Sequence, residues 1–263
     1  MNEDFSKYNG EGTILRKAQM RMLEILIEVD KICKKNRIPY WLDGGTLLGA
    51  VRHGGFIPWD DDLDITMLRK DYNKLRKILP KELPENFAFE DWKSNKFFVI
   101  KHAKVRDKNS YFEDLDWVGK DCLQGIYIDI FPKEKVISHK WRKRIDFFYG
   151  RAYRRIHGFN DNKKELAIAY LMWIPTVCVA TVCQFFSNLF SKDRLAHPYG
   201  GITFYHKCKE STIFPLKEIM FENQKFPIPC DAHQYLTWQY GDYMQIPPEE
   251  KRMVHARKIE IYD

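Results

Sequence analysis

Four aspartates within five positions are the residues of this chain best suited to chemistry: Asp60, Asp61, Asp62 and Asp64. They are interleaved with the apolar residues Trp59 and Leu63, so a fold that buries those residues also crowds the carboxylates. Crowded like charges repel and raise one another's pKa. A divalent metal ion would neutralise them, and oxygen ligands favour Mg²⁺ or Mn²⁺.

A β-strand over residues 63–67 would present two of these carboxylates together. Side chains alternate along a strand, so Asp62 and Asp64 share one face while Leu63 and Ile65 point to the buried face. We therefore expect Asp62 and Asp64 to bind the metal, with Asp60 and Asp61 in supporting positions.

A further acidic residue, Asp129, interrupts the apolar β-like run 125–132. A buried carboxylate needs a partner. One alternative is a metal shared with Asp62 and Asp64. The other is a salt bridge to an Arg or Lys in the core.

The residues Gly44, Gly45 and Thr46 precede these aspartates and predict a tight turn that lets phosphates approach the backbone. Thr46 is expected to cap a short helix over residues 47–52, whose N-terminal amides would face an anion.

Three cations are candidates for neutralising charge that develops on the phosphates: Arg52, Lys104 and Arg106. For Lys104 and Arg106 the alternative is an exposed strand face.

The elements that must position these residues follow from periodicity and from Gly and Pro. We expect helices over residues 13–35, 70–79 (closed by Pro80), 139–160, 192–209 and from Asp231 to about Tyr240. Strands are expected near residues 40–42, 63–67, 87–89, 97–105, 111–112 and 126–131.

The segment 166–183 carries no charge for 18 residues, the minimum for a membrane span. Pro175, Thr176 and Thr181 argue against a crossing, so we favour a buried or membrane-interface helix over a true span. The basic residues just before it favour the interface version, because cations are drawn to anionic lipid.

The 263 residues carry a formal net charge of +7, which indicates an anionic partner such as phosphate or a membrane surface. Nucleic acid is not expected, because the basic residues lack an interleaved stacking motif. The six cysteines form no CxxC pair and no signal-peptide pattern opens the sequence. We expect a cytoplasmic protein, with peripheral attachment to the inner face of the plasma membrane left open.

Several long motifs resemble one known family. These are WLDGGTLLGAVRHGGFIPWDDDLDI (residues 41–65), IDIFP (128–132), FEN (221–223), IPCD (228–231) and YGDYMQIPP (240–248). Together they are similar to the LicD family of phosphocholine transferases, with which fukutin-related transferases share a core. The resemblance implies an α+β, nucleotidyltransferase-like fold, in which a mixed sheet is flanked by helices. It implies a single domain with a core at about 13–135, a helical insertion at about 138–210 and a C-terminal segment at 211–263.

The resemblance also implies roles for individual residues. Asp62 and Asp64 match the metal ligands and Asp129 the third acidic residue, with Mg²⁺ or Mn²⁺ as the cofactor. The matches on the phosphate-binding side are Gly44, Gly45, Thr46, Arg52 and His53.

The implied activity is transfer of phosphocholine, or a similar phospho-group, from a CDP-linked donor to a sugar hydroxyl of lipopolysaccharide or teichoic acid. A quaternary ammonium group can sit among aromatic rings, for which Trp59, Trp117 and Tyr127 are candidates; ordinary core packing is the alternative.

Two other functions use the same features. A true nucleotidyltransferase would release pyrophosphate from a nucleoside triphosphate at the same metal site. A non-catalytic scaffold at a membrane surface would use the basic and apolar segments and leave the aspartates without a role.

Overall fold

The computed structural model describes residues 4–95, 101–114, 123–157, 162–200, 208–252, 254 and 256–262. Its centre is a mixed sheet with the strand order β1-β2-β6-β4-β3, and β7 pairs with β6. Its strands are β1 Trp41–Leu42, β2 Asp64–Leu68, β3 Phe87–Glu90, β4 Ala103–Asp107, β6 Tyr127–Lys135 and β7 Leu195–Ala196. The central strands β2 and β6 are parallel, and the other pairs are antiparallel.

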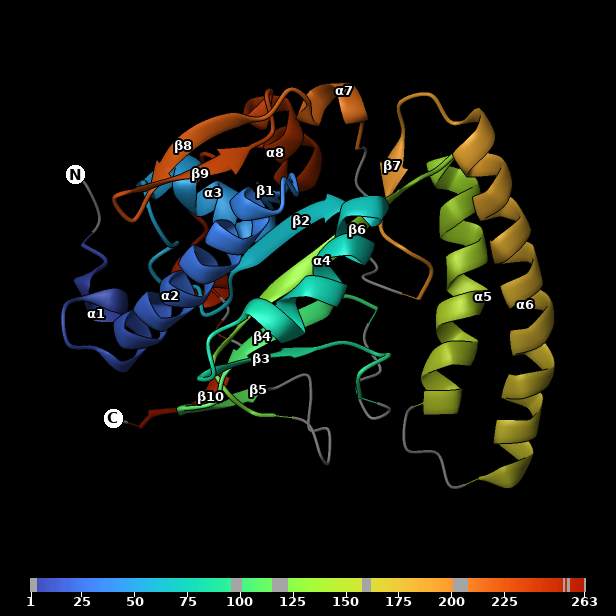
Figure 1. Ribbon diagram of the computed structural model, residues 1–263, viewed down its shortest axis with the longest axis horizontal. Helices are drawn as coiled ribbons and strands as arrows, with labels where there is room; N and C mark the ends of the chain where they lie inside the picture. Colours follow the sequence, from blue (N-terminus) through green and yellow to red (C-terminus); the bar gives the residue numbers. More distant parts are fainter. Residues whose placement is uncertain are drawn as a thin grey trace.

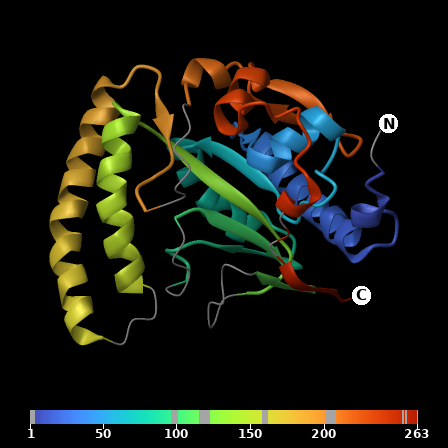
Figure 2. The same ribbon diagram turned by 180° about the vertical axis from the view of Figure 1, so that it is seen from behind.

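Two helices, α2 Ile14–Lys35 and α4 Arg69–Glu82, lie across one face of this sheet (Figure 1). Helix α2 buries an apolar stripe at helical spacing that includes Met22, Leu26 and Val29. Seen from behind, strands β4 and β6 lie in front of these two helices (Figure 2). A mixed sheet flanked by helices confirms the expected α+β class.

The C-terminal part packs beside β1, and its last strand lies at the opposite side of the fold (Figure 1). It contains α7 Glu210–Ile213, the hairpin β8 Lys217–Phe221 and β9 Gln224–Ile228, α8 Ala232–Tyr240, the 3₁₀ helix η1 Glu249–Lys251 and β10 Ala256–Ile261. Strand β10 pairs with β5 Ser110–Asp114. Helix α8 begins at Asp231, whose side chain accepts a hydrogen bond from the Gln234 amide, as the sequence predicted.

Helices α5 His139–His157 and α6 Lys163–Phe190 form an antiparallel pair beside the sheet (Figures 1 and 2). By length and composition α6 could cross a membrane, yet only 11% of its most apolar window is buried. The prediction of a helix buried within the domain is therefore wrong. Its apolar side chains face outward, which leaves the interface and the spanning alternatives.

One predicted helix boundary and one predicted helix are also wrong. Helix α4 continues through Pro80 to Glu82, because a proline in the last turn removes only one backbone donor while Leu79 stays buried. In the predicted helix 192–209, the described residues 192–200 contain the short strand β7 instead, and residues 201–207 lie outside the described part.

Candidate active site

The carboxylates of Asp60 and Asp64 lie against the first residues of helix α3 Gly44–His53. A Cβ atom on Gly44 would come within 2.6 Å of Asp64 Oδ2, and one on Gly45 within 2.5 Å of Asp60 Oδ2. Because real Cβ atoms do not approach oxygen so closely, the two glycines provide the room that these carboxylates occupy.

The Gly-Gly-Thr sequence forms the first turn of α3 rather than a separate turn before a helix. The carboxylate of Asp43 caps the helix by accepting from the Gly44 amide at 2.8 Å. Thr46, expected as the cap, instead accepts a hydrogen bond from the Asp64 amide through Oγ1 at 2.8 Å. The capping prediction was wrong because Asp43 already caps the helix three residues earlier, and Thr46 instead joins α3 to β2.

Burial and neighbouring charge act together on this acidic cluster. Burial, followed by the charge of Asp62, raises the pKa of both Asp60 and Asp64 well above the usual range. The negative charges of Asp129 and Asp43 add to the shift at Asp64. The cluster therefore concentrates negative charge that a cation would stabilise.

Asp129 stands directly beside Asp64, since the two residues are partners in the parallel register of β2 and β6. Its carboxylate lies 2.8 Å from Lys104 Nζ and 2.9 Å from His102 Nε2. Burial raises the pKa of Asp129, but Lys104 and His102 outweigh it and hold this pKa far below the usual range. The core salt bridge is thus present, while metal binding by Asp129 stays a prediction.

The exposed-face alternative for Lys104 and Arg106 is wrong, because both are almost fully buried. Lys104 reaches the cluster through Asp129. Arg106 is bound instead to Glu90 at 3.2 Å and to the Gly125 carbonyl at 3.1 Å. Of the two cations, only Lys104 contacts a carboxylate next to Asp64, namely that of Asp129.

Arg52 and His53 lie at the other end of α3. Arg52 donates to the Tyr243 carbonyl at 2.9 Å and, through Nε, to His53 Nε2 at 3.0 Å. Burial and the Arg52 charge lower the pKa of His53 to about 4, so its ring is neutral at pH 7. Arg52 thus holds the segment after α8 in place. Burial lowers the pKa of Arg52, and the charge of Asp60 partly offsets this effect.

Two residues that sequence reasoning missed contribute to the site. Asp43 accepts hydrogen bonds from Thr66 Oγ1 at 2.6 Å, Tyr235 OH at 2.9 Å and Gln239 Nε2 at 2.9 Å. It therefore joins α3, β2 and α8. An aspartate directly before Gly-Gly is a capping signal that could have identified it.

The second missed residue is Tyr240, at the end of α8. Its side chain is 47% exposed, while desolvation of its hydroxyl and then the charges of Asp64, Asp43 and Asp60 raise its pKa above the usual value. Its place at the start of the motif YGDYMQIPP (240–248) is the signal in the sequence that could have identified it.

The aromatic cage is not formed by the candidates that can be described. Trp59 is buried against Phe5 and Tyr8, with ring centroids 5.7 and 5.8 Å apart. Tyr127 packs edge-on to Phe112 at 5.2 Å. Cations of the protein itself also lie over both rings, with Lys104 Nζ 3.3 Å from the Tyr127 centroid and Arg252 Cζ 4.7 Å from the Trp59 centroid. Trp117 lies outside the described residues.

The donor chemistry of the cluster fits a hard divalent cation. Carboxylates that raise one another's pKa beside a glycine-lined space are suited to Mg²⁺ or Mn²⁺. Across the described part of the chain, however, no three His, Cys, Asp or Glu side chains are already arranged to coordinate an ion. Asp62 and Asp64 are the residues that would hold the metal, after side-chain adjustment.

Comparison with known proteins adds an independent observation. A family model described as "LicD/FKTN/FKRP, nucleotidyltransferase domain" matches residues 37–154. The chain is 30% identical over 254 residues to the lipopolysaccharide cholinephosphotransferase LicD of Haemophilus influenzae, covering 92% of this chain and 95% of that one. It is 41% identical over 150 residues to an uncharacterized protein of Rickettsia prowazekii, covering 56% and 48%. Human ribitol 5-phosphate transferase FKRP is 33% identical over 72 residues, covering 26% and 14%.

Proposed function

The chain belongs to the LicD family, and we propose that it transfers phosphocholine, or a similar phospho-group, from a CDP-linked donor to a sugar hydroxyl of a cell-surface glycan. At the coarser level, the similar proteins are named as transferases of cholinephosphate and ribitol phosphate, which supports phosphoryl-group transfer. Similarity over 92% of the chain supports phosphocholine and lipopolysaccharide as the first substrates to test.

The observation that carries this proposal is the acidic cluster against the glycines of α3. A Mg²⁺ ion held by Asp62 and Asp64 would neutralise phosphate oxygens of the donor. The free amides in the first turn of α3 would add positive potential toward the same phosphates. The acceptor hydroxyl would attack the phosphorus, the bond to CMP would break, and the proton would pass to a carboxylate of the cluster.

The membrane contact is also a proposal. The outward apolar surface of α6 is next to α5, whose exposed side chains include Lys140, Lys143 and Arg144. Apolar and cationic groups side by side favour the surface of an anionic bilayer. We propose peripheral attachment at the cytoplasmic face, close to a membrane-borne acceptor.

Product analysis tests the proposed function against the alternatives. The purified protein is incubated with Mg²⁺, lipopolysaccharide or teichoic acid, and a panel of CDP-linked choline, ethanolamine, ribitol and glycerol. We expect CMP to be released with at least one donor. Pyrophosphate from a nucleoside triphosphate, with no CMP from any donor, would favour the nucleotidyltransferase. The absence of both products and of Mg²⁺ binding would favour the scaffold.

A further inference from the structure

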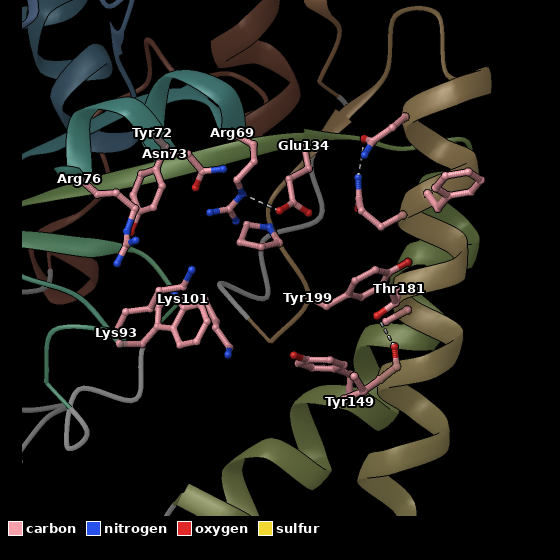
Figure 3. Close-up of a pocket in the computed structure, with 17 residues that line it drawn as sticks. Arg69, Tyr72, Asn73, Arg76, Lys93, Lys101, Glu134, Tyr149, Thr181 and Tyr199 are labelled. Atoms are coloured by element: carbon pink, nitrogen blue, oxygen red, sulfur yellow. Dashed lines mark hydrogen bonds and ion pairs between the residues drawn. The ribbon is translucent and has the colours of Figure 1, made fainter.

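A cavity lies between helix α4 and the α5–α6 pair (Figure 3). Its volume is about 550 Å³. Asp64 and Asp129 are paired near the start of β2 and β6, whereas Arg69 directly follows β2 and Glu134 lies near the end of β6. At about 3.3 Å per residue, the two sites are roughly 15 Å apart along the strands.

The side chains around this cavity are predominantly basic. Among the described lining residues, the charged ones are Arg69, Arg76, Lys93, Lys101 and Glu134. Arg69 binds Glu134 at 2.7 Å, and Arg76 is held by Asp91 at 2.6 Å. After these pairs are counted, Lys93 and Lys101 leave a surplus of positive charge facing the space.

Lys101 is the residue that most clearly requires an anion. Its Nζ lies 4.5 Å from the ring centroid of Trp92 and 4.3 Å from that of Tyr153. Within the described residues no carboxylate lies within ion-pair distance of it. Burial and then the nearby Arg69 lower its pKa to about 8. A partly buried ammonium group beside another cation is stabilised when an anion binds.

The cavity is continuous with the outward apolar surface of α6. Phe185 lines it and is itself 61% exposed. Tyr149 and Tyr199 approach it from the same side, opposite Arg69 and Lys101 (Figure 3). One side of the cavity is therefore cationic, and the other combines the rings of Tyr149, Tyr199 and Phe185 with the polar residues Thr181, Gln184 and Asn188 of α6. This arrangement suits a ligand whose phosphate group lies beside the cations and whose apolar chain leaves the cavity past Phe185.

We propose that this cavity binds the phosphate or diphosphate group of an amphipathic lipid, with Lys101 as its principal cation and α6 next to the lipid chain. The inference deepens the proposed function, because such a lipid would anchor a glycan acceptor near the enzyme. The test of this inference measures only binding. Lipid binding can therefore be refuted while phosphoryl transfer is confirmed, or confirmed while phosphoryl transfer is refuted.

The test is calorimetric titration of the full chain with farnesyl diphosphate, inorganic pyrophosphate and farnesol. EDTA is present, so that metal at the acidic cluster does not bind the diphosphates. The variants are Lys101→Gln and Lys93→Gln. The matched control is Lys77→Gln, an exposed lysine on α4 that does not line the cavity. Lys93 is exposed, so its variant reports on the cavity even if Lys101→Gln folds poorly.

We expect farnesyl diphosphate to bind the wild type and to bind Lys101→Gln at least tenfold more weakly. Lys93→Gln should bind farnesyl diphosphate several-fold more weakly, and Lys77→Gln should bind it within twofold of the wild type. The affinity for farnesol should be the same in all three variants as in the wild type. Tighter binding of farnesyl diphosphate than of pyrophosphate identifies a lipid, and equal binding identifies a free phosphate compound. The proposal is overturned if neither diphosphate binds, if both cavity variants bind like the wild type, or if Lys77→Gln loses as much affinity.

Discussion

Asp64 lies where four other carboxylates oppose its charge: those of Asp62, Asp129, Asp43 and Asp60. An ionised side chain in that environment lowers the stability of the fold, and a neutral residue of the same shape would avoid the repulsion. Such unfavourable charges are typical of functional sites. The Thr46 hydroxyl fixes the backbone of Asp64, so the carboxylate is positioned independently of any cation.

Replacing Asp64 with Asn should therefore stabilise the metal-free protein. The raised pKa means that the ionised form is disfavoured in the folded state, so the cost grows as pH rises above the value of the unfolded chain. We expect a gain of about 1–2 kcal/mol in the free energy of unfolding at pH 7, measured by urea titration in EDTA. Mg²⁺ should then raise the unfolding temperature of the wild type and not of Asp64→Asn. A less stable variant would contradict this account of the cluster.

At this scale the sequence was informative about residue types and less so about their partners. The cluster of aspartates could be identified because its members are adjacent in the chain. The strand face expected to be shared by Asp62 and Asp64 could not, since β2 begins only at Asp64, and metal binding by the pair stays a prediction. The pairing of Asp129 with Lys104 could not, because it depends on the register between β4 and β6, which are separated in the chain. The hydrogen bonds of Asp43 with Tyr235 and Gln239 likewise join positions 192 and 196 residues apart in the chain.

At the scale of elements, the beginning of α3 decides how the cluster is shaped. Gly44 has a φ of +53°, a conformation that favours glycine, and it lets the chain enter the helix beside Asp64. The sequence predicted that glycine is needed at this point, while phosphate binding by this backbone stays a prediction. It placed the helix start three residues late, because Gly-Gly usually indicates a break.

Substituting Gly45 with Ala should displace the Asp60 carboxylate, whose Oδ2 would lie 2.5 Å from the new Cβ. The Asp60 side chain can rotate away, so we expect the fold to persist and the rate of phosphoryl transfer to fall at least tenfold. The control is Gly54→Ala at the other end of α3. There φ is +71° and no atom lies within 4 Å of a Cβ, so only a stability loss of about 1 kcal/mol is expected. Equal rates in Gly45→Ala and the wild type would show that the glycine is not needed for space.

The β8–β9 turn is a second element whose role depends on one carboxylate. Glu222 accepts from Arg16 at 2.6 and 2.9 Å and from the Phe56 amide at 3.1 Å, so it joins the hairpin to α2 and to the segment after α3. Burial raises the pKa of Glu222, but the Arg16 and Phe56 hydrogen bonds outweigh it and lower this pKa overall.

This lowered pKa predicts a pH-dependent effect of Glu222→Gln. A carboxylate with a depressed folded-state pKa stabilises the protein above its unfolded-state pKa, and this contribution disappears as pH falls through the folded-state value. We expect the variant to lose about 1–2 kcal/mol at pH 7, after allowing for partial exposure. The difference should shrink below about pH 4. Chemical denaturation at both pH values measures it, and a loss of the same size at both would exclude the ionic origin.

For the whole molecule, the distinctive feature is the α5–α6 pair beside a compact catalytic core (Figure 1). Composition alone identified the apolar segment and its basic neighbour. It could not decide whether the segment was buried, because that depends on which faces the rest of the chain covers. The structure leaves Leu171 76% exposed and Ile174 64% exposed, which excludes a role in the core.

These exposed residues predict binding to anionic vesicles. Phosphatidylglycerol vesicles should co-sediment the wild type, and high salt should weaken the binding, because part of the attraction is electrostatic. Leu171→Asp combined with Ile174→Asp should abolish it. Ile14→Asp changes an apolar side chain that is 49% exposed on a different helix and should have no effect. If the wild type stays in the supernatant at low salt, the membrane contact is refuted.

The central claim is that the acidic cluster performs metal-dependent phosphoryl transfer, and one measurement tests it most directly. CMP release and phosphocholine incorporation are followed together, with CDP-choline, lipopolysaccharide and Mg²⁺, for the wild type, Asp62→Asn and Asp64→Asn. We predict equal amounts of CMP and incorporated phosphocholine for the wild type, and loss of both by at least a hundredfold in each folded variant or in EDTA. Wild-type rates in both variants would contradict the claim.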